Sequence, residues 1–180
     1  MPYLIRAINR ENWPEPEELS NIGDLIADAL SDITTSDNKL SVWYAEDIDD
    51  IYNALIAYLG TMDRWMGNDS IDFIAIDIDD IKEIDLPIIE EKNTTYIKGE
   101  DIRHRDIADL NYTSIESISK IIIKSINEGR DFIADTGKIK DLFIKAVQEN
   151  KICCDTVDKG RHGKLFKYIK DIESHLQTVS

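Results

Sequence analysis

The sequence has few residues that could hold a disulfide framework or a zinc ion. Its only two cysteines are neighbours, Cys153 and Cys154, and its three histidines are well separated. Adjacent cysteines can close only a strained ring, and a structural zinc site would need further ligands at usable spacing. This cysteine usage is typical of a compartment that keeps thiols reduced. We therefore expect a cytoplasmic protein without a disulfide framework.

Long apolar runs and common catalytic motifs are also missing. No apolar run approaches the roughly 18 residues that a transmembrane helix needs, so no membrane partner is expected. The sequence contains none of the motifs G-x-x-x-x-G-K-[ST], G-x-G-x-x-G, G-x-S-x-G or H-E-x-x-H. The common signatures of nucleotide binding, serine hydrolysis and zinc proteolysis are therefore excluded.

Positive charge is scarce. The chain has 21 Lys and Arg against 36 Asp and Glu, for a formal net charge of −15. Residues 138–180 carry nine basic and six acidic residues, which leaves −18 for residues 1–137. Such a surface repels nucleic-acid phosphates and attracts basic proteins at long range. We expect a basic protein partner and no direct nucleic-acid binding, although acidity can also serve solubility alone.

Hydrophobic periodicity predicts an α/β fold. Apolar runs at 3–8, 40–44 and 71–76 predict strands, and apolar residues at helical spacing over 48–59 predict a helix between the last two. A strand, a helix and a strand over this length predict a βαβ unit with parallel strands. The predicted fold is a small parallel or mixed sheet of about three to four strands with flanking helices. A further helix is predicted over 19–33.

The last third of the sequence predicts helices only. Helical spacing occurs over 115–126, 139–147 and 165–176, and Thr113-x-x-Glu116 has the form of a capping box. The expected organisation is an acidic α/β domain at 1–112, in which the fold of 83–112 is left open. An all-helical C-terminal part at 113–180 is expected to pack on that domain.

One short acidic pattern occurs twice. Residues 45–51 read AEDIDDI and residues 76–81 read IDIDDI, and each follows an apolar run. Because parallel strands end at the same edge of a sheet, both patterns are expected at one edge. The alternative is an ordinary strand-to-helix junction, because Asp is a favoured N-cap and is stabilised in a first helical turn. In that alternative the isoleucines of both patterns face the core, namely Ile48, Ile51, Ile78 and Ile81.

The leading functional hypothesis is a non-enzymatic interaction protein that binds a basic protein. Concrete forms are an antitoxin, an inhibitor, a DNA mimic or an accessory subunit of a bacterial or phage defence-type complex. No cofactor is expected, and a homo-oligomer stays open. Aromatic side chains are enriched at interfaces, so two tryptophans are predicted to contact the partner together with the acidic residues. The predicted contact residues are Glu46, Asp47, Asp49, Asp50, Asp79, Asp80, Trp13 and Trp65.

The alternative hypothesis is a Mg²⁺-dependent phosphoryl-transfer or nuclease-like enzyme. Asp47, Asp77 and Asp79 could supply oxygen ligands at the sheet edge, and the metal could activate water or clamp a phosphate. His104 and Asp106 could serve as proton-transfer groups, because a histidine beside a carboxylate can transfer protons near neutral pH. The competing interpretation of that His-Arg-Asp stretch is a short turn of helix on the surface.

A resemblance supports the same alternative. The run FIAIDID at 73–79 is an apolar strand that ends in Asp-x-Asp. It resembles the first motif of haloacid-dehalogenase-type phosphotransferases. The resemblance covers this short run, and Asp80-Ile81 stands where that family usually has Thr or Ser. It implies Asp77 as the nucleophile and Asp79 as the general acid and base.

Overall fold

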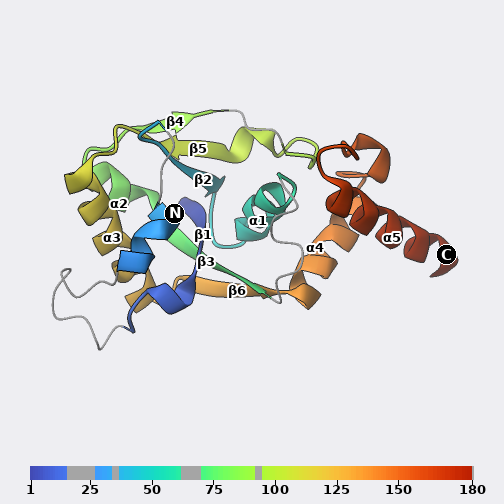
Figure 1. Cartoon of the computed structure of the whole chain (residues 1–180), viewed down its shortest axis with the longest axis horizontal. Coiled ribbons are helices and arrows are strands. Elements are labelled where there is room, and N and C mark those ends of the chain that lie inside the picture. Colours follow the sequence, from blue (N-terminus) through green and yellow to red (C-terminus); the bar gives the residue numbers. More distant parts are fainter. Residues whose placement is uncertain (16–26, 34–36, 62–69, 92–94, 180) are drawn as a thin grey trace.

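The computed structural model describes residues 1–15, 27–33, 37–61, 70–91 and 95–179, which form one sheet with helices on both faces (Figure 1). The strands are β1 (Tyr3–Ile8), β2 (Leu40–Ala45), β3 (Ser70–Asp77), β4 (Ile88–Glu90), β5 (His104–Ile107) and β6 (Asp131–Asp135). The α-helices are α1 (Ile51–Leu59), α2 (Ile78–Glu83), α3 (Tyr112–Asn127), α4 (Thr136–Gln148) and α5 (Gly163–Val179). Short 3₁₀ helices are η1 (Arg10–Asn12), η3 (Ala27–Ile33), η4 (Asp101–Arg103) and η5 (Cys154–Thr156). None of the helices in these ranges has the length and apolar character needed to cross a membrane.

All neighbouring strands of the sheet are antiparallel. Their order is β4-β5-β2-β1-β3-β6, so β1 lies between β2 and β3. Tyr3 of β1 is opposite Ala45 of β2 on one side and Asp77 of β3 on the other. Because β2 and β3 are each antiparallel to β1, they run in the same direction without pairing with each other.

The predicted small parallel or mixed sheet of three to four strands is therefore wrong. The sheet has six strands, and β1 lies between the two strands that were expected to pair. The apolar runs were misleading because continuous apolar strands reflect burial on both faces, which is commonest in parallel sheets. In β3, Phe73 packs on the α1 side and Ile74 on the opposite side, and both are buried.

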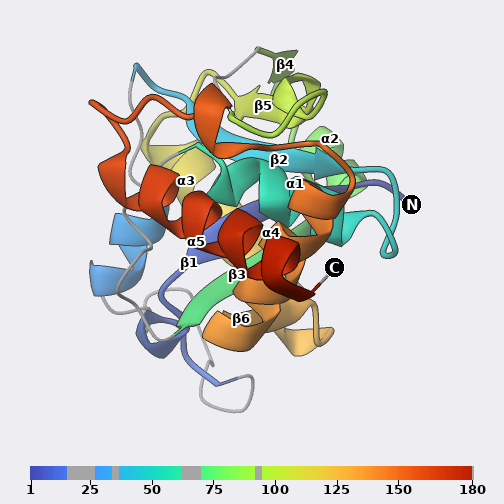
Figure 2. The ribbon, with the colours of Figure 1, turned by 90° about the vertical axis from the view of Figure 1, so that its right-hand side faces the viewer.

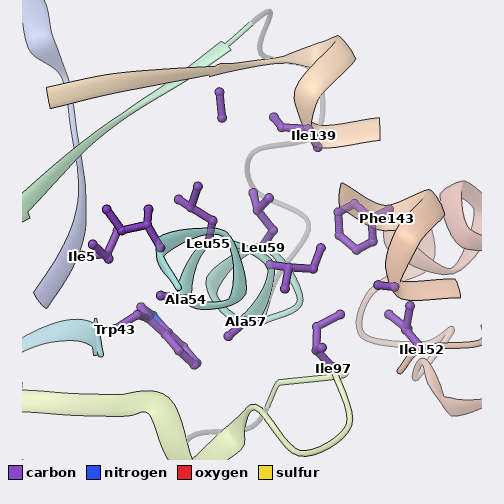
Figure 3. Close-up of a cluster of buried hydrophobic side chains, with 14 of the residues drawn as sticks. Ile5, Trp43, Ala54, Leu55, Ala57, Leu59, Ile97, Ile139, Phe143 and Ile152 are labelled. Atoms are coloured by element: carbon purple, nitrogen blue, oxygen red, sulfur yellow. The ribbon is translucent and has the colours of Figure 1, made fainter. Parts of the chain in front are cut away.

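The helix α1 lies at the centre of the core on one face of the sheet. Figure 3 shows Leu55 and Leu59 of α1 among side chains that come from several other elements. Helix α4 packs against α1, and α5 packs against α4 (Figures 1 and 2). The surrounding side chains are Ile5 of β1, Trp43 of β2, Ile139 and Phe143 of α4, and Ile97 and Ile152 from loops.

The opposite face of the sheet is covered by α3 and by η3. Ile118 and Ile122 of α3 pack with strand residues such as Leu4, Val42 and Ile74. The helix begins earlier than the predicted capping box. The side chain of Asn111 accepts hydrogen bonds from the N–H groups of Thr113 and Ser114, and Ser114 Oγ accepts one from the Asn111 N–H at 2.7 Å.

The C-terminal part of the chain is not all helical, so the prediction of helices only over 113–180 is also wrong. Strand β6 lies between α3 and α4 in the sequence and pairs with β3 at one edge of the sheet. Phe132 of β6 is opposite Phe73, and their rings stack with centroids 5.7 Å apart. At the other edge, 83–112 supplies β4 and β5. Of the helix predicted over 19–33, Ala27–Ile33 is a 3₁₀ helix and residues 19–26 lie outside the described residues.

Candidate functional site

The two acidic segments lie at the same end of the sheet. Each lies at the end of a strand: the first follows Ala45, the last residue of β2, and the second includes Asp77, the last residue of β3. Both strand ends face Tyr3 of β1. Adjacent strands are about 4.8 Å apart, so β2 and β3 are separated by about 10 Å with β1 between them. The acidic segments therefore flank the beginning of β1 rather than a groove between paired parallel strands.

The first acidic segment, residues 46–50, is a surface loop. Glu46, Asp47, Ile48 and Asp49 are all exposed. Asp47 Oδ1 accepts hydrogen bonds from the N–H groups of Asp49 and Asp50, each at 3.0 Å, which is the side-chain geometry of an Asx turn. In the part of the chain that the structure describes, no Lys or Arg forms a salt bridge with Glu46, Asp47 or Asp49. Three charges on this loop are thus uncompensated.

Asp50 differs from its neighbours because it points inward. Arg103 forms a two-pronged ion pair with its carboxylate, with Nη2 3.0 Å from Oδ1, and Asn53 Nδ2 lies 2.8 Å from the same oxygen. The N–H of Glu46 donates to Oδ2 at 2.9 Å. Burial acts to raise the pKa of Asp50, but these hydrogen bonds outweigh it and hold the pKa below its ordinary value. Asp50 therefore anchors the loop to η4.

In the second acidic segment, two aspartates are buried against a basic side chain. Asp77 caps α2 by accepting a hydrogen bond from the Asp79 N–H at 3.0 Å. The guanidinium of Arg130 approaches Asp77 at 3.7 Å and Asp80 at 3.5 Å. Lys124 Nζ lies 2.6 Å from Asp80 Oδ1. These carboxylates therefore fix the junction between β3, α2 and the start of β6.

The predicted contact residues are divided between the surface and the interior. Asp50 and Asp80 are held in ion pairs, whereas Trp13 is only 2% exposed and its indole N–H donates to Asp32 at 2.8 Å. Trp13 is thus a core residue in this fold, and Trp65 lies outside the described residues. The predicted contact residues that are exposed are Glu46, Asp47, Asp49 and Asp79.

The three aspartates proposed as Mg²⁺ ligands do not form a common site. Within the described ranges, no three His, Cys, Asp or Glu side chains are grouped closely enough to hold a metal ion. Asp77 faces Arg130, Asp79 pairs with Lys82 at 2.8 Å, and Asp47 holds its own loop. A guanidinium beside Asp77 would also repel a divalent cation. The resemblance that makes Asp77 a nucleophile therefore has no supporting geometry.

His104 and Asp106 lie elsewhere, on strand β5 rather than on the helix turn considered from the sequence. Both are buried, and His104 Nε2 lies 3.6 Å from Asp106 Oδ1. Ser41 donates to Asp106 at 3.2 Å, and Lys39 Nζ lies 3.8 Å from it. Strands β2 and β1 separate β5 from β3, a distance of about 14 Å, so this pair does not join Asp77.

The pKa of Asp106 reflects these surroundings. Burial raises it above the ordinary value, and a hydrogen bond with Glu91 raises it further. The same hydrogen bond, together with Lys39, lowers the pKa of Glu91. Asp106, Glu91 and Lys39 lie where β2, β4 and β5 meet. This network stabilises that edge of the sheet.

An apolar pocket lies beside the first acidic loop. Its volume is about 250 Å³, and it is bounded by loop 46–50, α1, β6 and α4. Three of its lining residues are large apolar side chains with more than half of their surface exposed: Ile48 at 59%, Tyr52 at 57% and Ile133 at 53%. Exposed apolar groups gathered at one place are typical of interaction sites.

Sequence reasoning missed this pocket because it assigned Ile48 to the core. The helix α1 begins at Ile51, so Ile48 lies in the preceding loop and does not continue the buried stripe of Ile51, Leu55 and Leu59. The local sequence gave no signal, because Ile78 also stands directly between two aspartates and packs against the core. Ile133 gave no signal, since its strand was not predicted.

Charged groups inside the pocket are already occupied. Arg130 contacts Asp77, Asp80 and Glu128. Asp131 accepts from Arg10 Nε at 2.8 Å, whereas the pocket residue Lys138 donates to the Ile133 carbonyl at 3.2 Å. The inner wall of the pocket therefore offers chiefly apolar surface. Among the described residues, the charges near the pocket that have no salt-bridge partner are the carboxylates of Glu46, Asp47 and Asp49 and the ammonium of Lys138.

No protein-family model matches this chain, and neither the curated proteins nor the solved structures provide a match. These comparisons therefore assign no role to any of its residues.

Proposed function

We propose that this chain is a non-enzymatic acidic interaction protein that binds a basic protein partner. An antitoxin, an inhibitor, a DNA mimic or an accessory subunit of a defence-type complex would each use such a surface. One observation carries the proposal: the exposed carboxylates Glu46, Asp47 and Asp49 surround the exposed Ile48, and none of them has a salt-bridge partner in the described ranges.

The contrast with the second acidic segment supports this choice. In that segment, Asp77 and Asp80 are paired with Arg130. Asp47 closes the turn of its loop, but the like charges of Glu46, Asp47 and Asp49 repel each other, and no cation offsets that repulsion within the described residues. A basic partner would relieve that repulsion, and complementary charge would also accelerate association in a salt-dependent way.

A capture experiment tests the proposal. The tagged chain is used to retain proteins from the native lysate at low and moderate salt, and mass spectrometry identifies them and their stoichiometry. The test variant E46Q/D47N/D49N removes three charges, and Asn at position 47 keeps a side-chain oxygen for the turn. Its matched control, E83Q/D85N/D109N, removes three exposed charges elsewhere. Asp85 and Asp109 have φ of 56° and 58°, which Asn tolerates.

We expect the wild type and the control to retain one stoichiometric basic protein, and the test variant to bind it at least about tenfold more weakly. Retention should decrease as salt rises. Equal retention by all three proteins would show that loop 46–50 is not the contact surface. Recovery of no protein at low salt would overturn the proposed function.

A further inference from the structure

We infer that the pocket beside loop 46–50 receives one aliphatic or aromatic side chain of the basic partner, carried on a segment whose flanking Lys or Arg residues face Glu46, Asp47 and Asp49. This inference rests on the proposed function and specifies which part of the partner is recognised. The pocket would then provide the apolar anchor, while the loop would provide charge complementarity.

The size of the pocket fits a single side chain. Drug-sized ligands usually occupy pockets of about 300–1,000 Å³, and this pocket has about 250 Å³. A cavity of about 150 Å³ already accommodates benzene in a protein core, so a phenyl or isobutyl group has room here. Residues that dominate the affinity of interfaces are typically such anchors, inserted into a pocket of the partner.

The walls of the pocket suit an apolar group. Ile51 and Leu55 of α1, Ala75 of β3, Ala134 of β6 and Leu142 of α4 contribute aliphatic surface. Phe132 adds an aromatic ring, which is itself stacked on the buried Phe73. These side chains come from four elements of the fixed sheet and its helices, so the pocket is formed before any partner binds.

The charges around the pocket select a basic segment. Glu46, Asp47 and Asp49 are within two residues of Ile48, which lines the pocket. Of the two cationic side chains in the lining, Arg130 is engaged by Glu128, Asp77 and Asp80, whereas Lys138 donates only to the Ile133 carbonyl. The three carboxylates of the loop outnumber this one cation, so the charge around the pocket stays negative. A second copy of the same chain would bring another net charge of −15 to this surface, which opposes self-association there.

Designed peptides provide the test on the full chain. The probes are Lys-Lys-Xaa-Lys-Lys peptides with Phe, Leu or Ala at the centre, and an uncharged Gly-Gly-Phe-Gly-Gly control. Binding is followed by the amide resonances of the protein in a two-dimensional NMR titration. We expect the Phe and Leu peptides to bind at least about tenfold more tightly than the Ala peptide. They should shift the resonances of residues 51–55 and 129–134.

A charge-increasing variant separates anchoring from simple attraction. Ile48→Glu with Tyr52→Glu replaces two exposed side chains, so the fold should be retained, and a carboxylate is favourable in the first turn of α1. If charge alone determined binding, this variant would bind every basic peptide more tightly. We expect it instead to lose the preference for Phe and Leu and to bind those peptides at least about tenfold more weakly.

The outcomes separate the two proposals. Equal binding of the Phe and Ala peptides, weakened by E46Q/D47N/D49N, would overturn the anchor and leave the acidic contact surface intact. Binding of the uncharged peptide as tightly as the basic ones would overturn the selection for a basic segment and indicate a pocket for neutral apolar ligands. If none of the peptides bound, this inference would be overturned. The proposed function would be overturned as well only if the capture experiment also recovered no protein.

Discussion

The guanidinium of Arg130 lies 3.7 Å from the carboxylate of Asp77, measured from Nη1 to Oδ2. Both side chains are mostly buried, at 13% and 12% exposure, and Asp77 also caps α2. The first aspartate of the Asp-x-Asp run is therefore bound into the fold by a cation and by a helix terminus. Its role is to fix the end of β3, which is a structural role and does not require a ligand.

Replacement of Arg130 should be strongly destabilising. Arg130→Met would leave Asp77 and Asp80 buried without their shared cation, which should lower the free energy of unfolding by about 3 kcal/mol. Urea denaturation followed by circular dichroism measures this. The control is Lys82→Met, which breaks the exposed pair with Asp79 and should change stability by less than about 0.5 kcal/mol. Similar values for the two variants would contradict the structural role of Arg130.

Gly60 is needed for close packing at the end of α1. A Cβ at this position would lie 2.6 Å from Ile97 Cγ1 and 2.7 Å from Thr95 Oγ1. Gly60→Ala should therefore lower the unfolding free energy by about 1–3 kcal/mol, as measured by thermal or urea denaturation. At Gly163, the first residue of α5, a Cβ would meet nothing within 4 Å, so Gly163→Ala should be neutral or stabilising. The reverse order of stabilities would refute this explanation.

The ion pair of Asp50 and Arg103 should give stability that depends on pH. The pKa of Asp50 is lower in the folded chain than its ordinary value of 3.8, so its stabilisation is complete above that value. It is lost as the pH falls through the lower, folded pKa. Asp50→Asn should thus cost about 2 kcal/mol at pH 7 and progressively less below pH 3.8. Urea denaturation at several pH values tests this, and a difference that stays constant with pH would contradict it.

The two neighbouring cysteines should differ in reactivity. A hydrogen bond to Glu173, together with burial and the charge of Asp155, raises the pKa of Cys154 to about 11. At pH 8 only about one Cys154 in a thousand would then be a thiolate, and the thiolate is the reactive form. Exposed Cys153 should be alkylated first by iodoacetamide, as mass spectrometry would show. Glu173→Gln should accelerate the alkylation of Cys154, and an unchanged rate would exclude the effect of Glu173.

Local features of this fold could be predicted from sequence. The strand before each acidic segment and the helices of the C-terminal part follow from apolar spacing, which reports burial directly. The position of both acidic segments at one end of the sheet was also expected, although the expected reason was wrong. Pairing could not be predicted, because β1 forms its contacts with residues such as Ala45 and Asp77, which are distant in the sequence.

The strands that were missed are short, with three to five residues each. Strand β5 reads His-Arg-Asp-Ile, and its first and third side chains are buried. Asp106 contacts Ser41 and Lys39, and His104 Nδ1 lies 2.8 Å from the carbonyl oxygen of Glu91. These contacts form only when β2, β4 and β5 lie side by side in the sheet. The pocket was missed for a related reason: it is formed by side chains from loop 46–50, α1, β3, β6 and α4, which are distant in the sequence.

Because β1 begins at Tyr3, between the ends of β2 and β3, any polypeptide joined ahead of that residue leaves the sheet beside both acidic loops. Pro2 already accepts a hydrogen bond there from the N–H of Ile78. A purification tag or a fused reporter at this end would therefore compete with a partner for the same surface. The end of α5 lies away from it (Figure 1), and a tag placed there leaves the carboxylates of loop 46–50 accessible.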